Sequence, residues 1–329
     1  MLEPGEVFTL GEECAGLSTG WSVVHELLPQ SHFVFASEAD AQLLALSEAN
    51  IKFADASNHD FQYTTMAVIG FPCQHFSEAG NNAGAVGNVK AVLAMIGRLA
   101  SSDRRPKMLL LENVWGLFKN HRKVLMKVVR ALAKAGYNVH VGFLNARMVS
   151  LQNRLRLFIV GILSACDSGT FSFDDVPAMC KWTDCSLENY LSLTDADFTI
   201  PDTSNKGRVF VRNWEFAQSQ ILPGQSDYSV VDMHASPKRK VCRLGYSPTL
   251  CASKCKGGAI CLVNKTASKL RVMRCDEMAR LQGWKSSMQL GAFSTLRGSA
   301  LRHALGNGIH RDVLKALVRT LFISQGILK

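Results

Sequence analysis

A cysteine, a glutamate and two arginines stand beside apolar runs of this sequence, where their side chains could do chemistry together. Cys73 follows one run and Glu112 another, while Arg154 and Arg156 precede a third. Ligands and catalytic groups gather at the carboxyl ends of strands in an open α/β sheet. A thiol held there is placed as a nucleophile, and the carboxylate and guanidinium groups complete a set suited to an electron-poor ring. Taken alone, Cys73 fits a buried core thiol equally well. The three runs are residues 66–69, 108–111 and 157–161.

The elements that must position these groups alternate between strand and helix over the first half of the chain. This alternation predicts an α/β fold, a doubly wound and mostly parallel Rossmann-like sheet. The expected strands include residues 32–36, 66–71, 108–111 and 139–144, and the expected helices include residues 40–49, 89–100 and 122–135.

The composition and the hydrophobic pattern of the sequence change after residue 163. Residues 164–272 are rich in Ser, Asp, Thr, Gly and Lys and contain short strand-like pieces. We expect no long amphipathic helix in this range. A helical pattern returns from residue 274 onward. We therefore expect a second, smaller and irregular domain, followed by a C-terminal segment.

The charge of the chain is divided unevenly. Residues 1–100 hold three basic and eleven acidic residues, a net charge of −8, whereas the remainder holds 34 basic and 16 acidic residues, a net of +18. Such asymmetry favours binding of a polyanion such as a nucleic acid by the C-terminal two thirds. The alternative is a solvated basic surface without a partner.

Other features of the composition exclude several classes of protein. No apolar run approaches the ~20 residues that span a bilayer, and the acidic start lacks the form of a secretory signal. An intracellular protein without a membrane partner is expected, with its ten cysteines reduced. A zinc site is the alternative for the cluster Cys242, Cys251, Cys255 and Cys261, but the spacing lacks paired CxxC motifs, so no metal is expected.

A glycine-containing turn near the N-terminus suggests a cofactor site. Gly16, Ser18 and Gly20 lie where a strand would turn tightly into a helix, so that the backbone can approach a ligand. Glu38 ends the next strand, where a carboxylate can accept hydrogen bonds from ribose hydroxyls. A plain turn is the alternative for the glycines.

Five motifs, taken in order, resemble the signature motifs of the cytosine carbon-5 methyltransferases. Their order and spacing match that family over nearly the whole chain. They are Pro72-Cys73-Gln74 with Phe76-Ser77 and Ala79-Gly80, Glu112-Asn113-Val114, Gln152-x-Arg154-x-Arg156, residues 274–284, and Gly306-Asn307-Gly308-Ile309.

This resemblance implies an enzyme that transfers a methyl group from S-adenosylmethionine to carbon 5 of cytosine in duplex DNA, on a base flipped out of the helix. Cys73 would form a covalent adduct with the base, and Glu112 would bind the base at its ring nitrogen and exocyclic amine. Arg154 and Arg156 would supply positive charge to the thiolate and stabilise the adduct. A salt bridge between Glu112 and Arg154 is the structural alternative.

The resemblance also implies domains and binding residues. Residues 1–163 would form the catalytic and cofactor-binding domain, residues 164–272 the target recognition domain, and residues 273–329 a C-terminal segment returning to the catalytic domain. The cofactor-binding residues would be Gly16, Ser18, Gly20, Glu38, Asp55 at the adenine edge and Asn307 at the amino-acid end. The nucleic-acid-binding residues would be Gln74, Ser77, Gln152, Lys238, Arg239, Lys240, Lys254 and Lys256, with a purely structural role as the alternative for Gln152.

The sequence departs from the family pattern in three places. Glu12-Glu13-Cys14-Ala15 replaces the usual start of the first motif, residues 87–90 replace an Asp-x-Arg pair, and Gly308 stands where serine is usual. These changes affect the expected cofactor pocket and leave the groups of bond-making chemistry in place.

Three alternative functions remain. RNA is a less favoured substrate, because the Cys-Phe-Thr signature of the tRNA-modifying branch is absent from residues 164–272. A catalytically silent nucleic-acid-binding paralogue is disfavoured by the presence of both Cys73 and Glu112. A dehydrogenase would leave the Pro72-Cys73-Gln74 motif unexplained. The expected location is the nucleus in a eukaryote or the cytoplasm and nucleoid in a bacterium, and no feature bears on oligomeric state.

Overall fold

The computed structural model shows two compact units in one chain. Unit 1 comprises Met1–Asn145, Leu155–Lys181 and Ile309–Lys329, and unit 2 comprises Ala146–Arg154 and Trp182–Gly308. The structure describes residues 5–56, 59, 62–71, 76, 92–98, 102, 105–180, 186–192, 197–219, 226–236, 246–285, 293–296 and 298–329.

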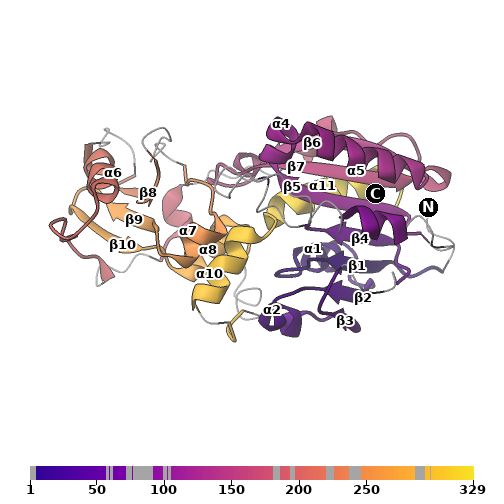
Figure 1. The fold of residues 1–329 in the computed structure, drawn as a ribbon, viewed down its shortest axis with the longest axis horizontal. Coiled ribbons are helices and arrows are strands. Elements are labelled where there is room, and N and C mark those ends of the chain that lie inside the picture. The colour runs from indigo at the N-terminus through magenta and orange to yellow at the C-terminus, as the bar shows by residue number, and fades with distance from the viewer. Residues whose placement is uncertain are drawn as a thin grey trace. The chain divides into compact units, whose positions relative to one another are not determined.

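Unit 1 is built on a seven-stranded sheet in the order β3-β2-β1-β4-β5-β7-β6 (Figure 1). The neighbours from β3 to β5 pair in parallel, and β7 runs antiparallel to both β5 and β6. This arrangement confirms the predicted α/β, mostly parallel and doubly wound fold. The strands are β1 Thr9–Glu13, β2 His32–Ser37, β3 Ile51–Phe53, β4 Met66–Ile69, β5 Met108–Val114, β6 Tyr137–Asn145 and β7 Leu155–Leu163.

The central strands form because their residues are apolar on both faces. All four residues of β4 and the first six of β5 are buried. Parallel strands covered on both faces appear in a sequence as continuous apolar runs. Strand order reverses between β1 and β4, since β2 follows β1 on one side and β4 flanks it on the other. Ligands of open α/β sheets bind outside the carboxyl ends of strands at such a reversal.

Helices cover the sheet and fix its strands. In α5, Leu125, Val128 and Leu132 form a buried stripe against a core that includes Ile69 and Leu109 of the sheet. The helices of unit 1 are α1 Thr19–Leu27, α2 Ala41–Leu46, α4 Trp115–Asn120, α5 Arg122–Lys134 and α11 Arg311–Ser324, with helical residues at 92–98 and 3₁₀ helices at Ser164–Cys166 and Phe173–Met179.

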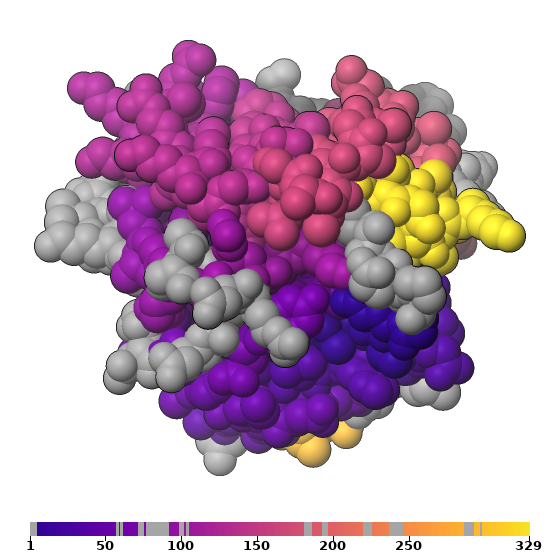
Figure 2. Space-filling view, turned by 90° about the vertical axis from the view of Figure 1, so that its right-hand side faces the viewer, coloured from indigo at the N-terminus to yellow at the C-terminus, as the bar shows by residue number. Residues whose placement is uncertain are grey.

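Both ends of the described chain lie in unit 1. The rings of Phe8, before β1, and Phe322, in α11, make an edge-on contact with centroids 5.0 Å apart. Figure 2 shows residues near the N-terminus, in indigo, next to the C-terminal residues, in yellow. Arg311 also donates to the hydroxyl of Ser22 at 3.0 Å and pairs with Glu26, which fastens α11 to α1.

Unit 2 contains a small antiparallel sheet in the order β10-β9-β8. Its core gathers Val231, Met233 and Cys261 against Phe210 and Trp214 of a helix. The elements are α6 Arg208–Ser219, β8 Tyr228–Asp232, α7 Ala252–Lys256, β9 Ile260–Asn264, β10 Lys269–Val272, α8 Cys275–Leu281 and α10 Gly298–Asn307, with 3₁₀ helices at Ala146–Met148 and Leu187–Tyr190.

Two details differ from the sequence analysis. The expectation of no long amphipathic helix within residues 164–272 is wrong, because α6 runs for 12 residues with Asn213 and Ala217 buried. Its apolar residues are separated by Arg and Glu, which masked the helical stripe. The compact units also divide the chain at other residues than those predicted, since residues 164–181 belong to unit 1 and residues 273–308 to unit 2.

Of the helices in the described residues, none is long and apolar enough to cross a bilayer.

Candidate cofactor and active site

The loop that follows β1 turns sharply toward β2. Cys14, Gly16 and Ser18 adopt φ values of 53°, 55° and 50°. This left-handed conformation suits glycine and costs energy for the other two residues. The amide of Cys14 donates to the hydroxyl of Ser37 at 3.3 Å, and the amide of Ala15 donates to the Ser37 carbonyl at 2.9 Å. The loop is therefore held at the carboxyl end of β2.

Glu38 lies against this loop. Its carboxylate accepts hydrogen bonds from the Gly16 amide at 2.8 Å and the Asp40 amide at 3.0 Å. Burial raises the pKa of the Cys14 thiol to about 12, with further contributions from Glu38, Glu13 and Asp55. The structure thus brings the predicted residues Gly16, Glu38 and Asp55 to one acidic edge, beyond the carboxyl ends of β1, β2 and β3.

The start of α1 has a role that the sequence analysis did not anticipate. The Glu12 carboxylate accepts a hydrogen bond from the Trp21 amide at 2.7 Å. A Cβ at Gly20 would lie 2.2 Å from Glu12 Oε1 and 3.0 Å from Val68 Cγ2. Glycine is therefore needed at position 20 for close packing of the helix on the sheet. An amide in the first turn of α1 thus bonds to a carboxyl group inside the protein.

Glu112 and Arg156 come together across β5 and β7. Val114 lies opposite Arg156 in this antiparallel pair, and Glu112 Oε1 lies 3.1 Å from Arg156 Nε. The two side chains are only 10% and 14% exposed, so the ion pair is poorly screened by solvent. The structure brings these two predicted catalytic residues into contact.

Asn113 forms a hydrogen bond between the end of β5, which carries Glu112, and the segment that precedes Cys73. Its buried side-chain amide donates to the carbonyl of Phe71 at 3.1 Å, and its side-chain oxygen accepts from the Val114 amide at 2.9 Å. Phe71 precedes Cys73 by two residues. The end of β5, which carries Glu112, is therefore fastened to the segment that follows β4. Asn113 lies within the second motif, and the sequence alone indicates no role for its side chain.

Six predicted site residues lie outside the described residues. They are Cys73, Gln74, Ser77, Lys238, Arg239 and Lys240. Their predicted roles stay predictions.

Arg154 and Gln152 have partners within unit 2. Arg154 is 2% exposed, and its guanidinium donates to three main-chain carbonyls, those of Leu250, Gly306 and Gly308. Gln152 is fully buried and donates to the Leu281 carbonyl at 3.1 Å. Among the described residues the two arginines have separate partners. Strand β7 begins at Leu155, so Arg154 precedes the strand that carries Arg156, and only residues within one strand share a face at a spacing of two.

The other predicted residues of unit 2 lie near its surface. Asn307 ends α10, and its side chain contacts Nε2 of His303 at 3.2 Å. Lys254 forms an ion pair with Asp232, whereas Lys256 is exposed. Burial raises the pKa values of Cys255 and Cys261 to about 12.

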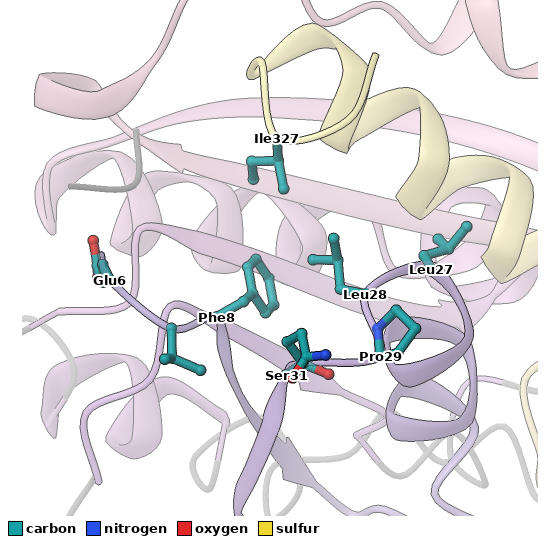
Figure 3. Close-up of a pocket in the computed structure, with 9 residues that line it drawn as sticks. Glu6, Phe8, Leu27, Leu28, Pro29, Ser31 and Ile327 are labelled. Atoms are coloured by element: carbon teal, nitrogen blue, oxygen red, sulfur yellow. The ribbon is translucent and has the colours of Figure 1, made fainter. Parts of the chain in front are cut away.

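A cavity at the amino end of β1 is separate from this site. It encloses about 300 Å³ between Phe8, Leu28 and Ile327 (Figure 3). Glu6 at its rim pairs with Lys107 at 2.6 Å. The glycine loop lies at the other end of β1, so this apolar cavity is not the predicted cofactor site.

Comparison with known proteins gives the family. The sequence pattern of the family described as C-5 cytosine-specific DNA methylase matches residues 7–322. The chain belongs to this family. It is similar to the Type II methyltransferase M.DsaV of Dactylococcopsis salina, with 27% identity over 302 residues, covering 88% of this chain and 79% of that protein. It is also 27% identical to the Type II methyltransferase M.NlaX of Neisseria lactamica over 303 residues, covering 88% of each.

Solved structures share the fold of this family member. The Dnmt2 methyltransferase of S. pombe superposes with a TM-score of 0.68 at 18% identity, covering 96% of this chain and 98% of that one. The Entamoeba histolytica methyltransferase EhMeth gives a TM-score of 0.66 at 13% identity, covering 98% and 100%. The predicted family and its methyltransferase fold are confirmed, and membership implies a methyl donor as co-substrate.

Glu12, in the first motif of this family member, should make stability depend on pH. Burial raises its pKa from 4.5 to about 8. The folded state then keeps a proton that the unfolded state loses above pH 4.5, so stability falls as pH rises from 4.5 to 8. Glu12→Gln removes this titration. We expect the variant to gain about 1–3 kcal/mol over the wild type at pH 8 and little at pH 4.5, by urea unfolding.

Glu26→Gln provides the matched control, with the opposite sign. Burial acts to raise the pKa of Glu26, but hydrogen bonds from Lys315 and Arg311 lower it overall. This carboxylate therefore stabilises the fold above its ordinary pKa, and its loss should weaken the protein at pH 8. An equal effect of Glu12→Gln at both pH values would contradict the assignment.

Proposed function

We propose that the chain transfers a methyl group from S-adenosylmethionine to carbon 5 of cytosine in duplex DNA, through a covalent bond to Cys73. The observation that carries the proposal is the hydrogen bond from Asn113 to the Phe71 carbonyl. It fastens the strand end that carries Glu112 to the segment two residues from Cys73. Membership in the C-5 cytosine-specific DNA methylase family supports the same substrate.

The chemistry begins with the nucleophile, because carbon 5 of cytosine reacts too weakly with an electrophile on its own. The Cys73 thiolate adds to carbon 6, and the electrons of the ring double bond move toward carbon 5. An ordinary thiol is only a few per cent ionised at neutral pH, so positive charge nearby favours the attacking form. S-adenosylmethionine supplies the electrophilic methyl group that carbon 5 then accepts. A base removes the carbon-5 proton, the sulfur–carbon-6 bond breaks, and the ring recovers its aromatic form.

Glu112 would hold the base during this addition. A carboxylate at the ring nitrogen and exocyclic amine favours protonation of the ring nitrogen, which draws electrons from carbon 6. Arg156 orients that carboxylate through the 3.1 Å ion pair in a site shielded from water. The geometry of the pair is set by two hydrogen-bonded strands, so little reorganisation is needed when the base arrives.

The acidic edge of unit 1 fits S-adenosylmethionine. Its sulfonium and amino groups are cationic, and its ribose offers hydroxyl donors. Glu38 and Asp55 provide carboxylates beside the left-handed turn at Gly16. Gly20, which also packs α1 on the sheet, would complete this turn, and Asn307 would approach the amino-acid end of the donor.

The target cytosine would leave the duplex to react. Its carbons 5 and 6 are stacked between neighbouring bases, and extrusion costs a few kcal/mol. Contacts from Gln74 and Ser77 to the vacated space would offset that cost. Lys256 and the basic residues at 238–240 would bind phosphates, which makes affinity fall as salt rises.

The direct test uses methyl-labelled S-adenosylmethionine with two substrates supplied separately, unmethylated genomic DNA and unmodified tRNA. Label recovered as 5-methylcytosine in DNA is the expected result, and bisulfite sequencing then locates the modified sites. Label recovered in tRNA alone would replace the proposal with the RNA alternative. An intact protein that binds DNA and labels neither substrate would instead be the silent paralogue.

A further inference from the structure

The chain passes between the two units four times, and three of these crossings lie within the described residues. They fall between Asn145 and Ala146, between Arg154 and Leu155, and between Gly308 and Ile309. The first two of these crossings are close together in the sequence, and the third lies 154 residues beyond the second. Hydrogen bonds between these segments of unit 2 therefore join distant parts of the chain.

Arg154 makes hydrogen bonds at all three crossings. It is the last residue of the first segment of unit 2, at the second crossing, and its main-chain carbonyl accepts from the Ala146 amide at 3.0 Å. Its Nη2 group donates to the carbonyl of Gly308 at 2.7 Å and to that of Gly306 at 3.2 Å. Its Nη1 group donates to the Leu250 carbonyl at 2.9 Å. One buried side chain therefore joins segments up to 154 residues apart.

Two of the three carbonyls that Arg154 binds, those of Gly306 and Gly308, lie at the C-terminal end of α10. The last carbonyls of a helix have no partner within it and carry the negative end of its dipole, so a guanidinium is stabilising there. A Cβ at Gly306 would lie 2.4 Å from the main-chain nitrogen of Ala252, so glycine is needed for this close approach. The backbone on either side of Asn307 is thus fixed by Arg154 from one side and packed against α7 from the other.

Two glutamines extend the same network. Gln152 donates to the Leu281 carbonyl at 3.1 Å and to Oε1 of Gln282 at 3.3 Å, and it accepts from the Leu250 amide. Gln282 donates in turn to the carbonyl of Leu305, which lies in the last turn of α10. The ends of α8 and α10 are therefore joined to residues 152–154 by buried side chains.

We propose that Arg154 is a positioning residue, not a catalytic one: it clasps the chain crossings and fixes the backbone around Asn307. The inference rests on the proposed function and revises the role of one residue within it. A clasp is expected to govern how well the methyl donor and DNA are bound. Arg156 would then favour the ionisation of Cys73, and the carboxylate of Glu112, paired with Arg156, would bind the base.

The test compares Arg154→Lys with Arg156→Lys, since both keep the charge and lose the planar fork. Hydrogen–deuterium exchange at residues 146–150 and 304–309 should accelerate at least fivefold in Arg154→Lys and stay at the wild-type rate in Arg156→Lys. In methyl-transfer assays, Arg154→Lys should raise KM more than it lowers kcat, with an unchanged pH profile of kcat. Arg156→Lys should lower kcat.

The exchange measurement needs no activity, so its outcome is independent of whether the proposed reaction is correct. Wild-type exchange in Arg154→Lys together with a fall in kcat and a shifted pH profile would overturn the proposal, since Arg154 would then act on the reacting atoms. If Arg154→Lys does not fold, Gln282→Leu removes one bond of the same network. It should accelerate exchange at residues 304–309 with kcat retained, and unchanged exchange in that variant would also overturn the proposal.

Discussion

Cys73→Ser should lower methyl transfer by about 10⁴-fold or more, the scale of loss when a catalytic nucleophile is removed. A hydroxyl is far less acidic than a thiol, so almost none of it is ionised at neutral pH. Binding of S-adenosylmethionine and of duplex DNA should remain close to wild type, because the substitution changes one atom. Single-turnover transfer of a labelled methyl group measures the first quantity, and titration of each ligand measures the second.

A second readout follows the covalent bond itself. Duplex DNA that contains 5-fluorocytosine should trap the wild-type protein in an adduct that survives denaturation, because fluorine cannot leave as a proton. Cys73→Ser should form no such adduct. Cys180→Ser is the matched control, since burial raises the pKa of that thiol, and it should transfer methyl groups and form the adduct normally. A fully active Cys73→Ser protein would reject the mechanism.

Glu112→Gln should lower kcat by about 10²–10⁴-fold, the range for loss of a positioned acid or base. Glutamine keeps the shape of the side chain and removes its charge. It can no longer draw a proton toward the ring nitrogen, and Arg156 loses its counterion in a site where both side chains are at most 14% exposed. Steady-state assays at saturating DNA give kcat.

Thermal unfolding separates catalysis from stability in this variant. Breaking the largely buried ion pair between Glu112 and Arg156 leaves one charge uncompensated and destabilises the fold. The variant should nevertheless unfold well above the assay temperature, and its loss of kcat should persist at lower temperatures where it is fully folded. A kcat within threefold of wild type would remove Glu112 from the chemistry.

The sheet could be predicted from the sequence because its central strands are buried on both faces. Residues 66–69 and 108–111 form continuous apolar runs, which only a covered parallel strand or a buried helix requires. The position of α6 could not be predicted in the same way, because its apolar stripe is narrow and interrupted by Arg and Glu. Its burial depends on the β8–β9 surface, which the sequence does not reveal.

The site was predictable to the extent that it depends on strand ends. Gly16, Glu38 and Asp55 follow three neighbouring strands, so their proximity follows from the fold. The role of Asn113 was not predictable, because its partner is a main-chain carbonyl 42 residues away. The contacts of Arg154 with three carbonyls could not be predicted for a related reason: these partners are also main-chain atoms, which leave no pattern in a sequence.

This reliance on main-chain partners has a consequence for how members of the family can exchange parts of their chains. The longer segment of unit 2 begins after Lys181 and ends at Gly308. The carbonyls that Arg154 grips are present in every polypeptide, whatever the side chains. A foreign segment spliced in at these borders therefore presents the same acceptors, provided that a glycine stands where Gly306 meets Ala252. Recombination between relatives can then exchange residues 182–308 while Arg154 stays with the rest of the chain.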